Sequence, residues 1–237
     1  MAMRATPLRM TEPSQFAFPP SAPAAAPIEG GGLFPVRRIF CVGKNYAAHV
    51  AEMGGDARRD APVFFTKAAD CLVAHGSDVP YPPMTEDLHF EGELVVALKA
   101  GGRNVVSSAA EGLVFGFAAG CDLTRRDLQA QAKKAGAPWD MAKSFDASAP
   151  MGVIAKGVVD PSARLVTRVN GAVSQDAPLS AMIWPVADVI AELSLYIELR
   201  AGDLIFTGTP AGVAPLSKGD RVSVCVDGAP PLEFSMS

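Results

Sequence analysis

Short apolar segments separated by glycine, proline and aspartate dominate this chain, and they constrain its fold more than any other feature. Phe34–Val42, Leu94–Leu98 and Leu113–Ala119 have the length and composition of strands. Turn signals such as Gly202-Asp203 and Gly219-Asp220 divide the later segments. Because strands do not alternate regularly with helices, the pattern favours an α+β fold with a β-rich core over a doubly wound parallel sheet.

Few segments predict a well-formed helix. The first is Thr124–Ala135, which Gly136 and Pro138 terminate, and the second runs from about Pro185 to about Tyr196. One or two helical turns are also expected within residues 46–53.

The first 32 residues differ in composition from the rest of the chain. Residues 1–32 are rich in Pro, Ala and Gly, and we expect them to form a tail or a loose wrap around the body. Residues 33–237 are then one domain. With 49% hydrophobic and 19% charged residues, the chain can bury a sizeable core.

Composition excludes several classes of partner. The net charge is −4 and no basic run is long enough to follow phosphates, so nucleic acid is not expected to bind. No stretch approaches the ~18 apolar residues of a membrane span. The four cysteines are far apart without a C-x-x-C pair, which predicts reduced thiols and a cytoplasmic protein.

Three carboxylates lie at the ends of predicted strands. Glu91 and Glu93 precede the run Leu94–Leu98, and their spacing of two places both side chains on one face of a strand. There each would repel the other unless a cation or a proton intervened. Asp122 follows the run Leu113–Ala119. The three together suit Mg²⁺, Mn²⁺ or Ca²⁺; alternatively, they are solvent-facing charges at strand ends.

Two histidines lie near carboxylates in the sequence. His49 and Glu52 share one face if residues 46–53 are helical, so they form either a water-activating base with its orienting carboxylate or a surface ion pair. His89 would share the face of Glu91 and Glu93 if that strand begins early. We expect it to be a neighbour rather than a ligand, because an oxygen-rich site does not need imidazole.

Two further segments could contact an anionic ligand. Lys143 lies among apolar and aromatic residues, so its ammonium is either half-buried against a carboxylate or an anionic ligand, or extended to solvent. The segment 207–210, Thr-Gly-Thr-Pro, closes a predicted strand. It either presents hydroxyl and N–H groups to a carboxylate or is simply a turn.

Together these segments resemble the fumarylacetoacetate hydrolase family. The matching stretches are GKNYAAHVAEM (43–53), HFEGELVVAL (89–98), GCDLTRRDLQ (120–129), PWDMAKSFDASAPMG (138–152) and GDLIFTGTPAGV (202–213). Within the family, FPVRRIFCVGKNYAAH and IWPVADVIAELS are most similar to bacterial fumarylpyruvate hydrolases and acylpyruvases. The resemblance implies that residues 33–237 form a β-rich sandwich or roll with few short helices, of the type found in the C-terminal domain of fumarylacetoacetate hydrolase. It also implies a homodimer, which is the usual state in the family.

The resemblance also implies a role for each candidate residue. The metal ligands, with Mg²⁺ the usual ion, would be Glu91, Glu93 and Asp122. The water-activating pair would be His49 and Glu52. The carboxylate and keto oxygens of the substrate would be held by Arg126, Gln129, Lys143 and Thr209.

The implied activity is hydrolysis of a carbon–carbon bond in a 2,4-diketo acid such as 3-fumarylpyruvate, as in the breakdown of aromatic compounds. His49 would take a proton from water, while Lys143 and Gln129 would stabilise the oxyanion. The alternatives are oxaloacetate decarboxylation, hydration or isomerisation of a 2-oxo acid, or a non-catalytic Ca²⁺-stabilised binding protein. We expect the acyl end of the substrate to contact the tail, residues 54–62 or the loop 75–88.

Overall fold

The computed structural model describes residues 16–52 and 62–237, in which short strands outnumber helices. The strands are β1 (Ala25–Pro27), β2 (Leu33–Pro35), β3 (Arg38–Gly43), β4 (Val63–Lys67), β5 (Leu72–Ala74), β6 (Asp78–Val79), β7 (Leu88–His89), β8 (Gly92–Leu98), β9 (Val114–Cys121), β10 (Thr124–Arg125), β11 (Ala149–Met151), β12 (Ala155–Lys156), β13 (Arg164–Val169), β14 (Ala172–Pro178), β15 (Asp203–Phe206), β16 (Arg221–Val226) and β17 (Leu232–Met236). The helices are α1 (Ala47–Glu52), α2 (Ser107–Ala110), α3 (Arg126–Ala135), α4 (Asp140–Lys143) and α5 (Val186–Tyr196), with 3-10 turns η2 (Ala69–Cys71), η3 (Glu111–Leu113) and η4 (Leu179–Ala181).

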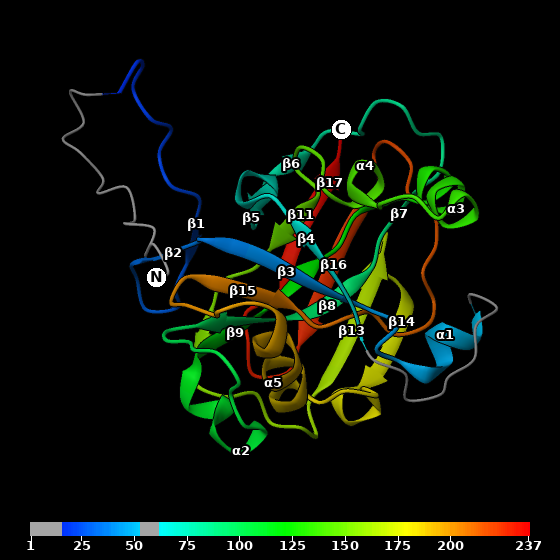
Figure 1. Ribbon diagram of the computed structural model, residues 1–237. Helices are drawn as coiled ribbons and strands as arrows, with labels where there is room; N and C mark the ends of the chain where they lie inside the picture. The colour runs from blue at the N-terminus through cyan, green and yellow to red at the C-terminus, as the bar shows by residue number, and fades with distance from the viewer. Residues whose placement is uncertain (1–15, 53–61) are drawn as a thin grey trace.

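Two sheets form the body (Figure 1). The larger has eight strands in the order β4-β3-β15-β8-β9-β11-β5, with β12 paired to β9. The smaller has five strands in the order β14-β13-β16-β17-β6. Sheets of mixed direction with short helices at their margins confirm the prediction of an α+β fold with a β-rich core.

The central strand β8 is buried on both faces, and its side chains alternate between two hydrophobic cores. Leu94, Val96 and Leu98 face the core between the two sheets. Val95 and Ala97 face a second core on the opposite side of the large sheet. A strand buried on both faces is continuously apolar, as here. The polar residues that the site needs are therefore confined to the end of this strand.

Pairing partners explain where the observed elements differ from the predicted ones. The segment Phe34–Val42 is not one strand, because β2 pairs with β1 whereas β3 lies between β15 and β4. The helix predicted to begin at Thr124 begins at Arg126 instead, since Thr124 and Arg125 pair with β7. The second predicted helix is α5, which starts directly after Pro185.

The end of the expected tail takes part in the fold. Ala26 of β1 is buried in the second core, and Ile28 forms a bridge with Ile154. Residues 16–23 stand away from the body in Figure 1, and residues 1–15 lie outside the described residues. Close contacts with the body therefore begin before residue 33.

None of the helices in the described ranges is long and apolar enough to cross a membrane. The four cysteines are free thiols, and Cys41, Cys71 and Cys121 are buried. Burial raises the pKa of the Cys121 thiol above its ordinary value, so this thiol is protonated at neutral pH.

Gly120→Ala should destabilise the protein by about 1–3 kcal/mol, because the second core has no room for a methyl group. A Cβ at this position would lie 2.3 Å from Val95 Cγ2 and 2.8 Å from the Phe206 ring. Chemical denaturation measures the change. Gly112→Ala is the matched control, since a Cβ there meets nothing within 4 Å. Equal stability of the two variants would contradict the tight packing.

Candidate metal centre and active-site pocket

Three buried carboxylates meet where β8 begins and β9 ends. One carboxylate oxygen each from Glu91, Glu93 and Asp122 lies within 4.8 Å of the others. The antiparallel register of β8 and β9 causes this, because it pairs Glu93 with Gly120, and the Asp122 N–H donates to the Glu91 carbonyl at 2.8 Å. The predicted proximity of the three side chains is thus present, although Glu91 lies just before the strand.

Basic side chains compensate two of these carboxylates. Lys143 Nζ lies 2.7 Å from Glu91 Oε2 and 2.7 Å from Asp122 Oδ2, and Arg126 Nη2 lies 2.5 Å from Glu91 Oε1. Burial alone would raise the pKa of Glu91, but Lys143 and Arg126 hold it well below its ordinary value. Lys143 is therefore a buried lysine paired with carboxylates, the first of the two alternatives drawn from the sequence.

Glu93 has no basic partner within the described part of the chain. Its Oε2 accepts a hydrogen bond from the Gly208 N–H at 2.8 Å. Burial, followed by the charges of Asp122 and Glu91, raises the pKa of Glu93 well above its ordinary value. A cation among these oxygens would relieve that repulsion.

The donor set fits a hard divalent cation. Its oxygens come from Glu91, Glu93 and Asp122, and carboxylate oxygens are the ligands that Mg²⁺ and Mn²⁺ prefer. Asp122 Oδ1 is buried without an aligned hydrogen-bond donor, although Lys67 Nζ is only 2.8 Å away. This oxygen can therefore accept a metal ion.

Lys67 is a residue of this site that the sequence analysis missed. It ends β4, is buried, and donates hydrogen bonds to the carbonyl oxygens of Leu123 and Lys143 in addition to its ion pair with Asp122. The available signal was a charge at the end of the apolar run Val63–Phe65, where burial demands a partner.

Lys67→Met should lower the free energy of unfolding by about 3 kcal/mol, because it leaves a buried aspartate with one cation fewer. Urea denaturation of metal-free protein measures the loss. The exposed Lys99→Met is the matched control and should change stability by less than about 0.5 kcal/mol. Similar stabilities of the two variants would show that Lys67 does not support Asp122.

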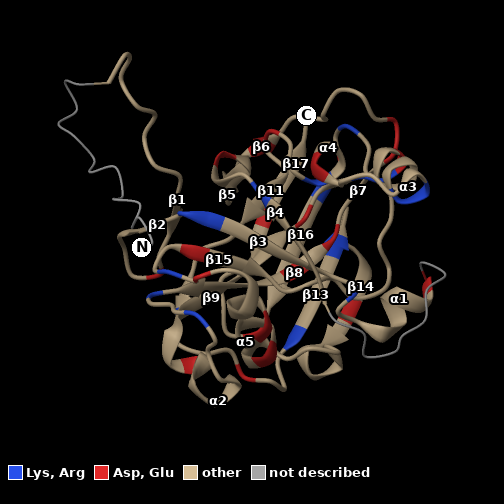
Figure 2. Cartoon of the chain, viewed as in Figure 1, with Lys and Arg blue, Asp and Glu red and all other residues tan. Residues whose placement is uncertain are grey.

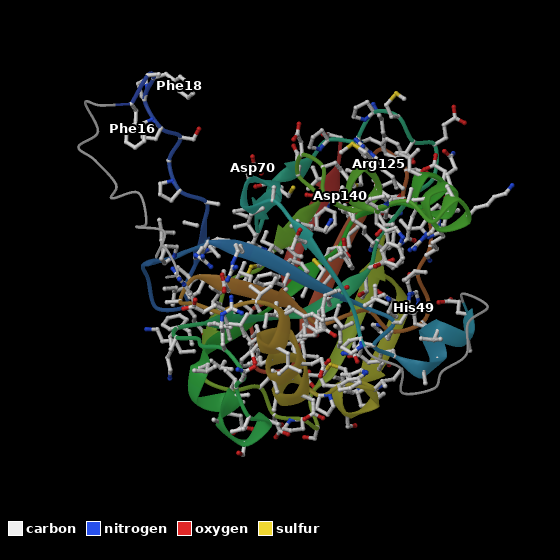
Figure 3. All side chains as sticks on the ribbon, in the orientation of Figure 1. Phe16, Phe18, His49, Asp70, Arg125 and Asp140 are labelled. Carbon is white, nitrogen blue, oxygen red and sulfur yellow. The ribbon has the colours of Figure 1, made fainter. Side chains whose placement is uncertain are left out.

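His49 and Glu52 form a pair on α1 (Figure 3 labels His49). His49 Nδ1 lies 3.2 Å from Glu52 Oε2, and both Glu52 oxygens accept from the Gly212 N–H at 3.1 and 3.2 Å. Glu52 therefore fixes the imidazole against the 208–212 turn. Since Nδ1 is engaged, Nε2 is the ring nitrogen that remains for proton transfer.

A cavity of about 220 Å³ brings most of the candidate residues together. Those that line it are His49, Glu91, Glu93, Arg126, Gln129, Lys143 and Thr209. Its other walls are Val42, Gly43, Lys44, Val50, Phe65, Lys133 and Trp139. Among the candidates, Asp122 and Glu52 do not line the cavity, but each directly contacts a residue that does. The His–Glu pair and the carboxylates therefore lie at the same cavity.

His89 does not belong to this cavity. β7 ends at His89 and β8 begins at Gly92, so the strand does not begin early enough to include His89. β7 pairs with β10 instead of continuing into β8, and His89 Nε2 lies 2.8 Å from Asp87 Oδ1. The choice of His89 as a neighbour rather than a ligand agrees with this geometry.

The turn at residues 207–210 supports the carboxylates. Gly208 has φ of +99°, and a Cβ there would lie 2.8 Å from the Asn45 Cβ, so only glycine can direct this N–H at Glu93. Thr209 Oγ1 donates to the Gly92 carbonyl at 2.8 Å and accepts from Gln175 Nε2 at 2.7 Å. Thr209 thereby ties the turn to the start of β8.

Comparisons with known proteins identify relatives of this chain. The chain is 41% identical to the solved fumarylpyruvate hydrolase from Pseudomonas aeruginosa in complex with Mn²⁺ and pyruvate, with a TM-score of 0.91 over 93% of this chain and 98% of that one. It is 39% identical to a fumarylpyruvate hydrolase from Ralstonia sp, over 73% of this chain and 91% of the relative. It is also 39% identical to the mitochondrial oxaloacetate tautomerase FAHD1 of Mus musculus, over 84% and 91%.

A family model described as the fumarylacetoacetate (FAA) hydrolase C-terminal matches residues 38–236. The match covers both sheets and every residue of the carboxylate cluster. The chain therefore belongs to the fumarylacetoacetate hydrolase family.

Proposed function

We propose that this protein is a metal-dependent hydrolase that cleaves acylpyruvates such as 3-fumarylpyruvate into pyruvate and a carboxylic acid. The observation that carries the proposal is that the His49–Glu52 pair and the carboxylate cluster face one cavity. A base held beside a cation site is what water attack on a carbonyl requires. The similarity to fumarylpyruvate hydrolases supports the same choice.

Each residue of the cavity then has a role in the reaction. Glu52 orients His49, whose Nε2 takes a proton from water while the water oxygen bonds to the carbonyl carbon at position 4. The bond between C3 and C4 breaks, its electron pair stays on C3 as the enolate of pyruvate, and a proton on C3 completes the product. Glu91, Glu93 and Asp122 would hold a divalent cation, which when bound supplies Lewis-acid polarisation of a carbonyl oxygen.

Arg126, Gln129 and Lys143 are suited to bind the substrate oxygens. Arg126 Nη1 donates to Gln129 Oε1 at 2.6 Å, which leaves the Gln129 amide N–H groups for a ligand. Lys143 uses two of its three donors on Glu91 and Asp122. The third can stabilise the developing oxyanion.

Tautomerisation of oxaloacetate is the second candidate, because a relative of 39% identity carries that name. It needs proton transfer but no attack by water; decarboxylation of oxaloacetate likewise needs no attack by water, only a proton on C3 of the pyruvate enolate that loss of CO₂ leaves. His49 could also serve this proton transfer, but a pair that activates water is needed only for hydrolysis, which favours the first candidate.

Pyruvate release from 3-fumarylpyruvate and from oxaloacetate, measured side by side with Mg²⁺ and Mn²⁺, distinguishes these functions. The proposal expects fast release from 3-fumarylpyruvate and slow release from oxaloacetate with either ion. Release from oxaloacetate alone would identify a decarboxylase. Loss of the enol absorbance of oxaloacetate without any release would identify a tautomerase.

We also propose that the protein acts as a homodimer in the cytoplasm, in the breakdown of aromatic compounds. The family resemblance supports the dimer, and reduced cysteines support the compartment. Light scattering of purified protein at two concentrations tests the dimer.

A further inference from the structure

One face of α3 runs along the cavity. Arg126, Gln129 and Lys133 follow one another at spacings of three and four, so they share that face, and all three line the cavity. Seven residues at 1.5 Å each separate the ends of this row by about 10 Å. Arg126 contacts the carboxylate cluster through Glu91, so Lys133 lies at the distal end.

Lys44 and Lys133 are exposed to solvent where they line the cavity, and Lys133 lies at its distal end. Lys133 Nζ lies 5.3 Å from the centroid of the Trp139 ring, and in the described ranges it has no ion pair with a carboxylate. Partial burial, followed by the charge of Arg126, lowers the pKa of Lys133; Glu91 opposes this shift, whereas Lys143 and Lys44 add to it. A Cβ on Gly43, the residue before Lys44, would lie 3.6 Å from Trp139 Cζ3, so the chain at Lys44 and the Lys133 ammonium both lie beside this ring. Figure 2 shows the basic residues of α3 in blue.

The backbone of Lys44 is held firmly at the end of β3. Its φ of +62° is uncommon for a residue other than glycine. The next residue, Asn45, is buried and fixes this turn: its Nδ2 donates to the Thr207 carbonyl at 2.7 Å, and its Oδ1 accepts from the Trp184 N–H at 2.7 Å. Lys44 likewise has no carboxylate partner in the described ranges. Uncommon backbone that its surroundings hold in place is frequent at ligand sites.

The wall between the two ends is apolar. Val42, Phe65 and Trp139 line the cavity, and the Phe65 and Trp139 rings are 5.8 Å apart. This surface suits a short hydrocarbon chain. Basic residues thus lie at both ends of the cavity. Arg126 and Lys143 pair with Glu91 at one end, whereas the lysines at the distal end have no carboxylate partner in the described ranges.

We propose that Lys133 and Lys44 bind a second carboxylate, at the far end of the acyl group, so that the preferred substrates are acylpyruvates with a terminal carboxylate. This inference rests on the proposed function, which places the pyruvate end of the ligand at the carboxylate cluster and so directs its acyl end toward the lysines. It differs from the expectation that the tail or the loop 75–88 contacts the acyl end, since neither residues 16–32 nor that loop lines this cavity; residues 1–15 and 54–61 of the expected contacts lie outside the described residues.

Two non-cleavable ligands test the proposal without any turnover. 2-Oxoheptanedioate and 2-oxoheptanoate have equal chain length and lack the 4-keto group, and only the first has a distal carboxylate. Titration calorimetry with Mg²⁺ gives both dissociation constants. The diacid should bind wild-type protein about tenfold more tightly, and high salt should reduce this preference.

The double variant Lys44→Met, Lys133→Met should bring the ratio of the two dissociation constants close to one. Lys134→Met is the matched control, because it removes a neighbouring charge of α3 that does not line the cavity, and it should keep the ratio. A preference for the diacid that survives in the double variant, or a wild type without one, would overturn the proposal.

The same experiment separates this inference from the proposed reaction. If wild-type protein prefers the diacid but does not cleave 3-fumarylpyruvate, the distal carboxylate site stands and the hydrolase assignment fails. If it cleaves 3-fumarylpyruvate but binds both ligands equally, the hydrolase assignment stands and the lysine site fails.

Discussion

Replacing His49 with Ala is expected to lower kcat for 3-fumarylpyruvate hydrolysis by a factor of about 10²–10⁴, the usual contribution of a positioned general base. The reason is that His49, which Glu52 holds at 3.2 Å, is the proposed acceptor of the proton from water. Divalent-cation affinity should stay within about twofold, because carboxylates bind Mg²⁺ without help from imidazole. Steady-state kinetics and metal titration measure the two quantities.

His75→Ala is the matched control for this variant. His75 is exposed and only accepts a hydrogen bond from the Glu233 N–H, so its loss should change neither quantity. Glu52→Gln should reduce kcat less than His49→Ala, since the amide can still accept the hydrogen bonds that position the ring. Full turnover by His49→Ala would exclude His49 as the base.

Glu93→Gln is expected to abolish Mg²⁺-dependent activity and to weaken Mg²⁺ binding by a factor of about 100 or more, since the variant loses one of three charged ligands. Glu93 is the carboxylate of this cluster without a basic partner in the described chain, so its charge is the one a metal ion most directly compensates. Removing it also removes repulsion with Glu91 and Asp122. The metal-free variant should therefore be at least as stable as metal-free wild type.

Thermal unfolding with and without Mg²⁺ measures both the stability of the metal-free protein and the stability gained on Mg²⁺ binding. Wild type should gain about 2.7 kcal/mol when Mg²⁺ is present at about 100 times its Kd, and Glu93→Gln should gain almost nothing at that concentration. Glu233→Gln is the matched control on the exposed side of β17 and should respond as wild type does. An equal Mg²⁺ response in Glu93→Gln would show that the cation binds elsewhere.

Local pattern offered the carboxylate cluster as one of two alternatives, because strand ends can be located in the sequence, and the family resemblance selected it. Glu91, Glu93 and Asp122 flank apolar runs, and antiparallel pairing of those runs brings the flanks together. The β-rich α+β class followed from the same runs. The start of α3 was wrong by two residues because β10 pairs with a strand far away in sequence, which local pattern does not show.

Contacts distant in sequence account for what local pattern missed. Lys67 and Lys143 belong to segments 76 residues apart, and the partners of Lys67 become visible only once β4 and α4 meet. Whether His89 shares a strand face with Glu91 stayed open in the sequence, because nothing there indicates the break between β7 and β8. In the sequence Lys133 is only a charge on a predicted helix, and nothing there indicates that it lines one cavity with Lys44.

The most direct test of the central claim is the quantity of both products formed from 3-fumarylpyruvate by metal-loaded wild-type protein. The account predicts pyruvate and fumarate in equal amounts, and loss of both when EDTA removes the metal ion. Unchanged 3-fumarylpyruvate with Mg²⁺ or Mn²⁺ present, or equal release of both products in EDTA, would contradict it.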